Sequence, residues 1–208
     1  MGALDKKLRQ ETQFELMDIQ EKTETTFVIV THDQEEAMTV ASRVAVMNEG
    51  RVIQVDPPDR IYETPTSTYV ADFIGEVNLI EGRATVKDAE AATLDWAEGQ
   101  PAILATPGVG LESGAKATFA IRPEKVASSA ERPADRNNVV QGRVHDIAYL
   151  GNISTYHVML PSGQIIKAQA ANSRRRASLA FTWEDTVWLS WTATAGEVMA
   201  RRISGAPP

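Results

Sequence analysis

His32 stands where a predicted buried strand changes into a predicted helix, and an imidazole there can donate a hydrogen bond to a phosphate oxygen or orient a water molecule. Residues 27–30 before it are four consecutive apolar residues, mostly β-branched, which is typical of a strand buried on both faces of a parallel sheet. Residues 37–44 after it repeat apolar side chains at helical spacing. Because α/β sheets place ligand-contacting residues at such strand ends, this position favours a functional histidine. A packed or capping histidine is an equal alternative on position alone.

Three other groups of residues have both a chemical and a structural interpretation. Glu35 and Glu36 could act as an acid and base pair, but acidic residues in the first turn of a helix also complement its dipole, and we favour that interpretation. The three arginines of residues 174–176 could bind an oxyanion, although a short charge run is more often a solvated loop. His145 and His157 have no third ligand nearby in the sequence, so we predict no metal site.

The elements that would position His32 begin with a helix expected over residues 4–20, with Asp5 as its cap. The helix after His32 has two capping-box spacings at its start, Thr31 with Gln34 and Asp33 with Glu36. A β-hairpin is predicted around residues 48–50, which separate two apolar runs. Two short helical segments are predicted after it, at residues 57–62 and 69–74.

Beyond residue 78 the chain consists of short alternating apolar runs broken by Gly, Pro and Asn, which predicts a small all-β barrel or sandwich. Trp188 and Trp191 fall on opposite faces of one predicted strand, so at least one of them is expected in the core. We find no repeat of fixed period in this sequence. The nine predicted strands are 79–86, 93–96, 102–105, 117–121, 139–150, 154–160, 165–168, 186–191 and 198–202.

The charge distribution agrees with a division into two domains, 1–78 and 79–208. Residues 1–78 hold 7 Lys and Arg against 15 Asp and Glu, whereas the other 130 residues hold 14 against 13. Neither part has the strongly basic face that binding to a nucleic-acid backbone requires, so no nucleic-acid partner is expected. There is no cysteine, no apolar run of about 18 residues and no secretory signal pattern, so we expect a soluble, intracellular protein.

The string VIVTHDQEEAM at residues 28–38 resembles the switch-histidine segment of ABC transporter ATPases, particularly those of importers. Residues 2–5 resemble the D-loop of that family, residues 45–51 the hairpin after the switch region, and residues 59–75 the end of the ATPase domain. The resemblance implies an α/β remnant of a P-loop NTPase domain. It also implies that His32 contacts the γ-phosphate or the attacking water, and that Leu4 and Asp5 lie at the interface between two ATPase subunits.

The second part is similar to the regulatory TOBE domain of such importer ATPases, which has an oligomer-binding (OB) type, MOP-like barrel. The string FAIRPEK at residues 119–125 contains that domain's motif, Arg122-Pro123-Glu124, and residues 149–163 resemble its next strand pair and turn. Residues 74–78 and 188–191 most resemble the polyamine members, which transport putrescine or spermidine.

The sequence lacks the phosphate loop G-x-x-x-x-G-K-[ST], the glutamine loop, the Leu-Ser-Gly-Gly-Gln signature and the strand that bears the catalytic glutamate. We therefore expect this chain to correspond to the C-terminal portion of a longer ATPase, with the match beginning just after the catalytic glutamate. The full-length parent would bind ATP and Mg²⁺, whereas this chain alone is expected to bind neither tightly and to be inactive, because phosphoryl transfer depends on the missing groups.

The resemblance implies association with membrane permease subunits and a second ATPase subunit, on the cytoplasmic face of the inner membrane, and a possible homodimer through the barrel. The alternative is a free-standing regulatory protein in which the β-rich part binds a small ligand such as an oxyanion, without ATPase activity.

Overall fold

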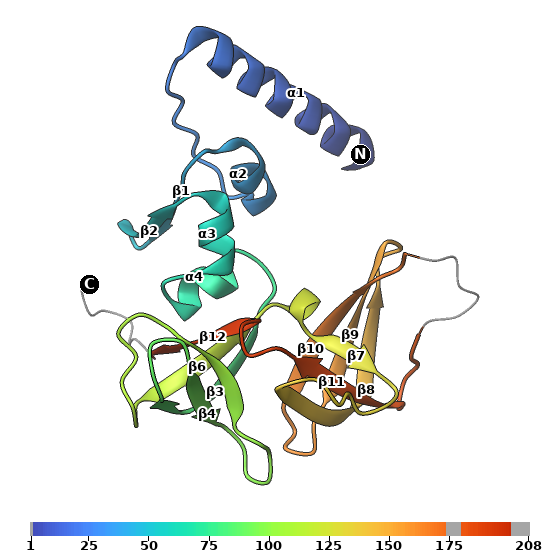
Figure 1. Ribbon diagram of the computed structural model, residues 1–208. Coiled ribbons are helices and arrows are strands. Elements are labelled where there is room, and N and C mark those ends of the chain that lie inside the picture. Colours follow the sequence, from blue (N-terminus) through green and yellow to red (C-terminus); the bar gives the residue numbers. More distant parts are fainter. Residues whose placement is uncertain (1, 174–179, 201–208) are drawn as a thin grey trace. The chain divides into compact units, whose positions relative to one another are not determined.

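The computed structural model describes residues 2–173 and 180–200, and the side chains among them from residue 11 onward. The chain divides into two compact units (Figure 1). The first comprises Met1–Pro65 and Phe73–Gly75, and the second comprises Thr66–Asp72 and Glu76–Pro208. No helix in the described part of the chain is long and apolar enough to cross a membrane.

The first unit contains the predicted hairpin and a short helix directly after it. At the hairpin turn Glu49 and Gly50 both have positive φ, 48° and 75°, which matches the type I′ turn that suits the twist of two antiparallel strands. The following helix begins at Pro58, whose fixed φ suits the first helical position and whose missing N–H has no partner to lose there. The elements of this unit are α1 (Gly2–Thr23), α2 (Gln34–Val40), β1 (Val44–Asn48), β2 (Arg51–Asp56) and α3 (Pro58–Glu63).

The predicted buried strand at residues 27–30 is absent. These residues have no regular secondary structure, and Val28 and Val30 are 88% and 93% exposed. An apolar β-branched run becomes a strand only where other strands pair with it, and none of the described strands does so: β1 and β2 pair only with each other. The first unit therefore exposes the apolar side chains of a segment that no sheet surrounds.

The predicted N-terminal helix is present as α1, but the expected cap is wrong. The helix already begins at Gly2, so Asp5 lies within its second turn instead of at the N-cap. The side chains of Leu4 and Asp5 lie outside the described residues. Farther along α1, Phe14, Leu16 and Ile19 are exposed, so the apolar positions of this helix are not covered by the described residues.

The second unit contains helix α4 (Thr68–Phe73) except for its last residue, and continues as a β structure in two parts. The first part is a closed barrel with the strand order β12-β5-β4-β3-β6, which confirms the barrel expected from the sequence. The second part is a five-stranded sheet with the order β10-β9-β8-β11-β7, which the prediction of one small barrel or sandwich did not distinguish from the first part. The barrel strands are β3 (Asn78–Val86), β4 (Ala92–Asp95), β5 (Ile103–Pro107), β6 (Lys116–Ile121) and β12 (Gly196–Ala200). The sheet strands are β7 (Ala127–Ser129), β8 (Asn138–Tyr149), β9 (Ile153–Met159), β10 (Ile165–Ala171) and β11 (Thr186–Trp191).

The barrel and the sheet are two copies of one arrangement. Strand β3 pairs with β4 and β6, and β8 pairs in the same way with β9 and β11. The first residues of these strands take equivalent partners, Asn78 opposite Ile121 and Asn138 opposite Trp191. The strands even share a sequence, NLIEGRA at residues 78–84 and NVVQGRV at 138–144. The sequence analysis found no repeat of fixed period, and the offset between the copies indeed differs from strand to strand; their sequences match clearly only in this one stretch.

The barrel is completed by a strand from a distant part of the chain, whereas the sheet is completed by the strand that directly precedes β8. After β6 the chain passes through the short 3-10 helix η1 (Pro123–Lys125) into β7, which pairs with β11 of the second copy. After β11 it returns as β12, which pairs with β6 of the first copy. Figure 1 shows β12, in red, beside β6, in light green. The barrel therefore takes its strands from two segments, residues 78–121 and 196–200, whereas the sheet takes all five of its strands from residues 127–191.

The core of the second unit extends through both copies. Phe119 of β6 and Trp191 of β11 stack with ring centroids 6.1 Å apart, and both belong to one continuous buried apolar cluster. Trp188, on the other face of β11, is partly exposed under the guanidinium of Arg132, so the prediction that one of these tryptophans is in the core is confirmed. Burial of aromatic and aliphatic surface is the main stabilising contribution here.

Candidate functional site

In the first unit, the turn that presents His32 is held by a small hydrogen-bond network. The backbone N–H of Glu36 donates to Asp33 Oδ1 over 3.1 Å, which makes Asp33 the N-cap of α2. The backbone N–H of Asp33 donates to Thr31 Oγ1 over 2.9 Å, and the Thr31 hydroxyl donates to Glu36 Oε2 over 2.6 Å. The predicted capping box of Asp33 and Glu36 is therefore present, closed through the Thr31 hydroxyl; the second predicted box, Thr31 with Gln34, is not formed.

This network leaves the imidazole of His32 exposed. No hydrogen bond joins it to any residue that the structure describes, so the packed or capping role has no support in the geometry. Asp33 carries out the capping that the alternative interpretation assigned to the histidine. The turn is thus built by the neighbours of His32, and both imidazole nitrogens remain available to a ligand.

In the second unit, the motif residues Arg122, Pro123 and Glu124 lie at the end of β6. Arg122 is only 4% exposed, and its Nη1 donates to the carbonyl oxygens of Ala71 (2.8 Å) and Glu76 (3.2 Å). Pro123 is buried and begins η1, and Glu124 is exposed. Arg122 therefore holds main-chain groups of its own chain.

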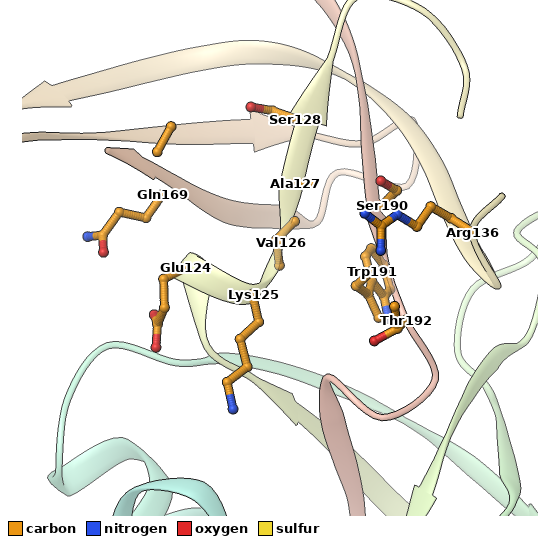
Figure 2. Close-up of a pocket in the computed structure, with 11 residues that line it drawn as sticks. Glu124, Lys125, Val126, Ala127, Ser128, Arg136, Gln169, Ser190, Trp191 and Thr192 are labelled. Carbon is orange, nitrogen blue, oxygen red and sulfur yellow. The ribbon is translucent and has the colours of Figure 1, made fainter. Parts of the chain in front are cut away.

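A cavity of about 400 Å³ adjoins this motif in the second unit (Figure 2). It lies between η1, β7, β10 and the end of β11. Glu124 belongs to its wall, so one predicted site residue lines it, whereas Arg122 and Pro123 do not. The other residues of its wall are Lys125, Val126, Ala127, Ser128, Arg136, Gln169, Ala170, Ser190, Trp191 and Thr192.

Three hydrogen-bond donors at this cavity have no partner among the described residues. Trp191 is 1% exposed, and its Nε1–H is buried and unpaired. Ser190 is 2% exposed and its hydroxyl makes no hydrogen bond with the part of the chain that the structure describes. Figure 2 shows the guanidinium of Arg136 directed toward both residues. Since indole and guanidinium groups only donate, the complementary ligand is an acceptor, such as a small anion.

The remaining candidates from the sequence are not brought into either place. His145 is exposed and His157 half-buried on neighbouring strands, and no group of three potential metal ligands occurs within residues 11–173 and 180–200. The arginines at 174–176 lie outside the described residues. His32 and the motif of Arg122 belong to different units.

Comparison with known proteins places the chain in a family. A family model for the TOBE domain matches residues 119–199. The chain is 44% identical to the putrescine transport ATP-binding protein PotG of Escherichia coli over 191 residues, covering 92% of this chain and 51% of PotG. It is 41% identical over 198 residues to the spermidine/putrescine import ATP-binding protein PotA of Nitrosospira multiformis, covering 94% of this chain and 54% of that protein.

The chain belongs with the C-terminal region of the ATP-binding proteins of polyamine ABC importers. It spans about half the length of the curated relatives that it matches. The family resemblance read from the motifs is thereby confirmed.

The fold of the second unit has a structural relative outside this family. A crystal structure of the cytoplasmic molybdate-binding protein ModG, with molybdate bound, superimposes on 59% of this chain and 95% of that one with a TM-score of 0.50 and 15% identity. At that identity the likeness concerns the fold alone.

Sequence reasoning missed Arg136, Ser190 and Gln169, because each is an ordinary residue on a loop or strand. The sequence does contain one signal for Arg136, the stretch shared by residues 78–84 and 138–144. Aligning the two stretches shows that Arg136 precedes the second by two residues, as Glu76 precedes the first.

Proposed function

We propose that this chain is part of the ATP-binding, energy-coupling subunit of an ABC importer for polyamines such as putrescine or spermidine. The observation that carries this proposal is the turn at His32, where Thr31, Asp33 and Glu36 fix the backbone while the imidazole stays exposed. The names of the relatives, which are transport ATP-binding proteins for these polyamines, support it.

In this proposal His32 contacts the γ-phosphate or the attacking water when ATP is bound. Phosphoryl transfer depends mainly on positioning and on stabilising charge, so a fixed turn with a free imidazole suits the task. ATP and Mg²⁺ supply the phosphoryl group and its charge neutralisation, but no phosphate loop occurs in these 208 residues. We therefore propose that this chain alone neither hydrolyses ATP nor binds it tightly.

The proposed partners follow from the same assignment. Leu4 and Asp5 would lie at the interface with a second ATPase subunit, and permease subunits would bind the ATPase domain at the cytoplasmic face of the inner membrane. The first domain, 1–78, would complete its sheet with strands from the remainder of an ATPase domain, which would cover the exposed residues Val28 and Val30. The motif Arg122-Pro123-Glu124 would belong to the regulatory domain, 79–208.

The test joins this chain to the N-terminal part of the Escherichia coli relative and compares His32→Ala with the unchanged fusion. Loss of a transition-state contact should lower ATP turnover by about 10² or more while Mg-ATP affinity stays nearly constant. His145→Ala, which removes another exposed histidine, serves as the control and should leave turnover unchanged. Retention of half or more of the turnover by His32→Ala would exclude the proposed role.

A second candidate function is supported by the cavity beside η1. We propose that it binds a small oxyanion, because Arg136, Ser190 and Trp191 offer unpaired donors there, while the opposite charges of Glu124 and Lys125 on its wall offset each other. Titration calorimetry with sulfate and with phosphate should show binding that Arg136→Ala abolishes. Arg132→Ala, in the same loop but stacked on Trp188, should leave binding unchanged. Absence of heat with both anions at millimolar concentration would exclude this function.

A further inference from the structure

The two copies in the second unit differ at one structurally equivalent position, at the end of β6 in the first copy and of β11 in the second. Since Asn78 lies opposite Ile121 and Asn138 lies opposite Trp191, the residues that follow these partners, Arg122 and Thr192, are equivalent. By the same register Glu76 and Arg136 are equivalent, each two residues before its strand. In the second copy Thr192 and Arg136 line the open cavity.

In the first copy the equivalent residues are in contact. Arg122 Nη1 donates to the carbonyl oxygen of Glu76, and also to that of Ala71. Where the second copy leaves donors free for a ligand, the first copy directs a buried guanidinium at the main chain of residues 71–76. These residues comprise the end of α4 and most of its link to β3, and within them residues 73–75 group with the first unit.

The chemistry of this contact is that of a strong, specific attachment. Ala71 lies in the last turn of α4, where the carbonyl oxygens have no intrahelical partner and where a positive charge is favoured by the helix dipole. Arg122 is almost fully buried, so its charge depends on such acceptors for stabilisation. A guanidinium can serve several acceptors from one rigid plane, which the single ammonium of lysine does less well.

Two further contacts hold the same segment where it enters the barrel. The side chain of Asn78 accepts from the backbone N–H of Lys167 (2.7 Å) and donates to the Lys167 carbonyl (2.9 Å), so it acts as one more pair of sheet hydrogen bonds. Asn78 is buried. The ion pair of Lys167 Nζ with Glu76 Oε2, at 3.4 Å, is exposed and contributes little.

We propose that Arg122 is a positioning residue that fixes the points where the chain leaves and re-enters the β domain, on either side of residues 73–75. It fills the place that the second copy keeps open as a cavity. If the chain works in an importer ATPase, Arg122 sets the attachment of the ATPase domain to its regulatory domain; that consequence rests on the proposed function, whereas the attachment itself does not.

The test is amide hydrogen exchange on the full 208-residue chain, which needs neither ATP nor transport. Arg122→Met should raise exchange in residues 70–78 by about tenfold or more, because hydrogen bonds to a buried charged group are among the stronger ones. Exchange in β8 and β9 should stay unchanged. Arg122→Lys, which keeps the charge without the planar fork, should restore part of the protection and also covers the case that the methionine variant fails to fold.

Two controls separate the attachment from general effects. Lys167→Ala removes the exposed ion pair to Glu76 but leaves both carbonyl acceptors of Arg122, and should leave exchange unchanged. Arg143→Met removes an exposed arginine that pairs with Glu184 in the second copy, and should also have no effect on residues 70–78. Unchanged exchange in Arg122→Met, or an equal rise throughout β8 and β9, would overturn the proposal. Neither result would bear on ATP hydrolysis by His32.

Discussion

At the scale of single residues, Glu197 on β12 has a carboxyl group whose charged form is destabilised by burial. Burial raises the pKa of Glu197 above its ordinary value of 4.5, since the charged form loses hydration. The folded chain therefore keeps this proton to a higher pH than the unfolded chain. The related stability is complete below about pH 4.5 and is lost as the pH rises through the raised pKa.

Glu197→Gln should accordingly raise the free energy of unfolding at pH 7, because the neutral amide avoids burying a charge. The gain should shrink as the pH falls toward 4, where the carboxyl is itself protonated. Urea unfolding at both pH values measures this, with the exposed Glu98→Gln as control. A larger gain at pH 4 than at pH 7 would contradict the assignment.

Asn138 is the second-copy equivalent of Asn78. Asn78 bonds from the barrel to β10 of the sheet, whereas Asn138 bonds from the sheet to β5 of the barrel. Its side chain accepts from the backbone N–H of Leu104 and donates to the Leu104 carbonyl, both over 2.8 Å. Asn138→Ala should lower the free energy of unfolding by about 3 kcal/mol, because two backbone groups lose their partner. The neighbouring Asn137→Ala, which removes one exposed bond to Ala193, should cost less than about 1 kcal/mol. Equal costs for both variants in urea titrations would show that the paired bonds have no special weight.

At the scale of elements, the sequence predicted best what local physics determines. The hairpin at residues 44–56 formed as expected, since the turn residues Glu49 and Gly50 and the apolar runs beside them specify it without help from afar. Helix α2 began at its predicted cap, Asp33, for the same reason. The prediction of a strand at residues 27–30 was wrong because a strand forms only where partner strands pair with it, and residue propensity carries no information about those partners.

The pairing of β7 with β11 and of β12 with β6 could not be predicted from the sequence either. β7 has three residues and its assignment depends wholly on pairing with β11, which follows it by more than fifty residues. The candidate cavity depends on the pairing of β7, because η1 and β7 form one of its walls. Arg122 could be singled out from the motif, but its acceptors at Ala71 and Glu76 are main-chain atoms without any sequence signal.

The exposed segment at residues 27–30 permits a prediction of its own. Replacing Val28 and Val30 by Asp should leave the stability of this chain within about 0.5 kcal/mol and reduce binding of an apolar dye, since both side chains already face solvent. The same pair of changes in the fusion with the N-terminal part of the relative should be strongly destabilising, if strands then cover the segment. Thermal melts of both proteins measure the contrast; a large loss of stability in this chain alone would show that the segment is already buried.

At the scale of the whole molecule, the two units differ in how much core each possesses. The second has one continuous buried cluster through both copies, from Ile80 and Phe119 to Leu189 and Val198. The buried apolar residues of the first are few, among them Val46 and Ile61, while much of α1 and of residues 27–30 is exposed. Because burial of apolar surface is the main contribution to stability, the first unit should be the less stable.

This difference predicts two unfolding transitions with separable probes. Helix α1 and most other helical residues belong to the first unit, so ellipticity at 222 nm reports mainly on it. All four tryptophans, Trp96, Trp183, Trp188 and Trp191, belong to the second, so their fluorescence reports only on that unit. In a urea titration the ellipticity should fall at lower urea than the fluorescence changes. Coincident curves would mean that the chain unfolds in one step and that the units share their stability.

Within the second unit the opposite behaviour is expected, although it contains two sheets. Because β12 pairs with β6 only after the chain has passed through β7–β11, and because one buried apolar cluster runs through both copies, unfolding of either copy removes packing from the other. Native-state hydrogen exchange should therefore give the same opening free energy for β4 in the barrel and β9 in the sheet. Opening of β9 at markedly lower free energy than β4 would show that the shared cluster joins the copies without making them cooperative.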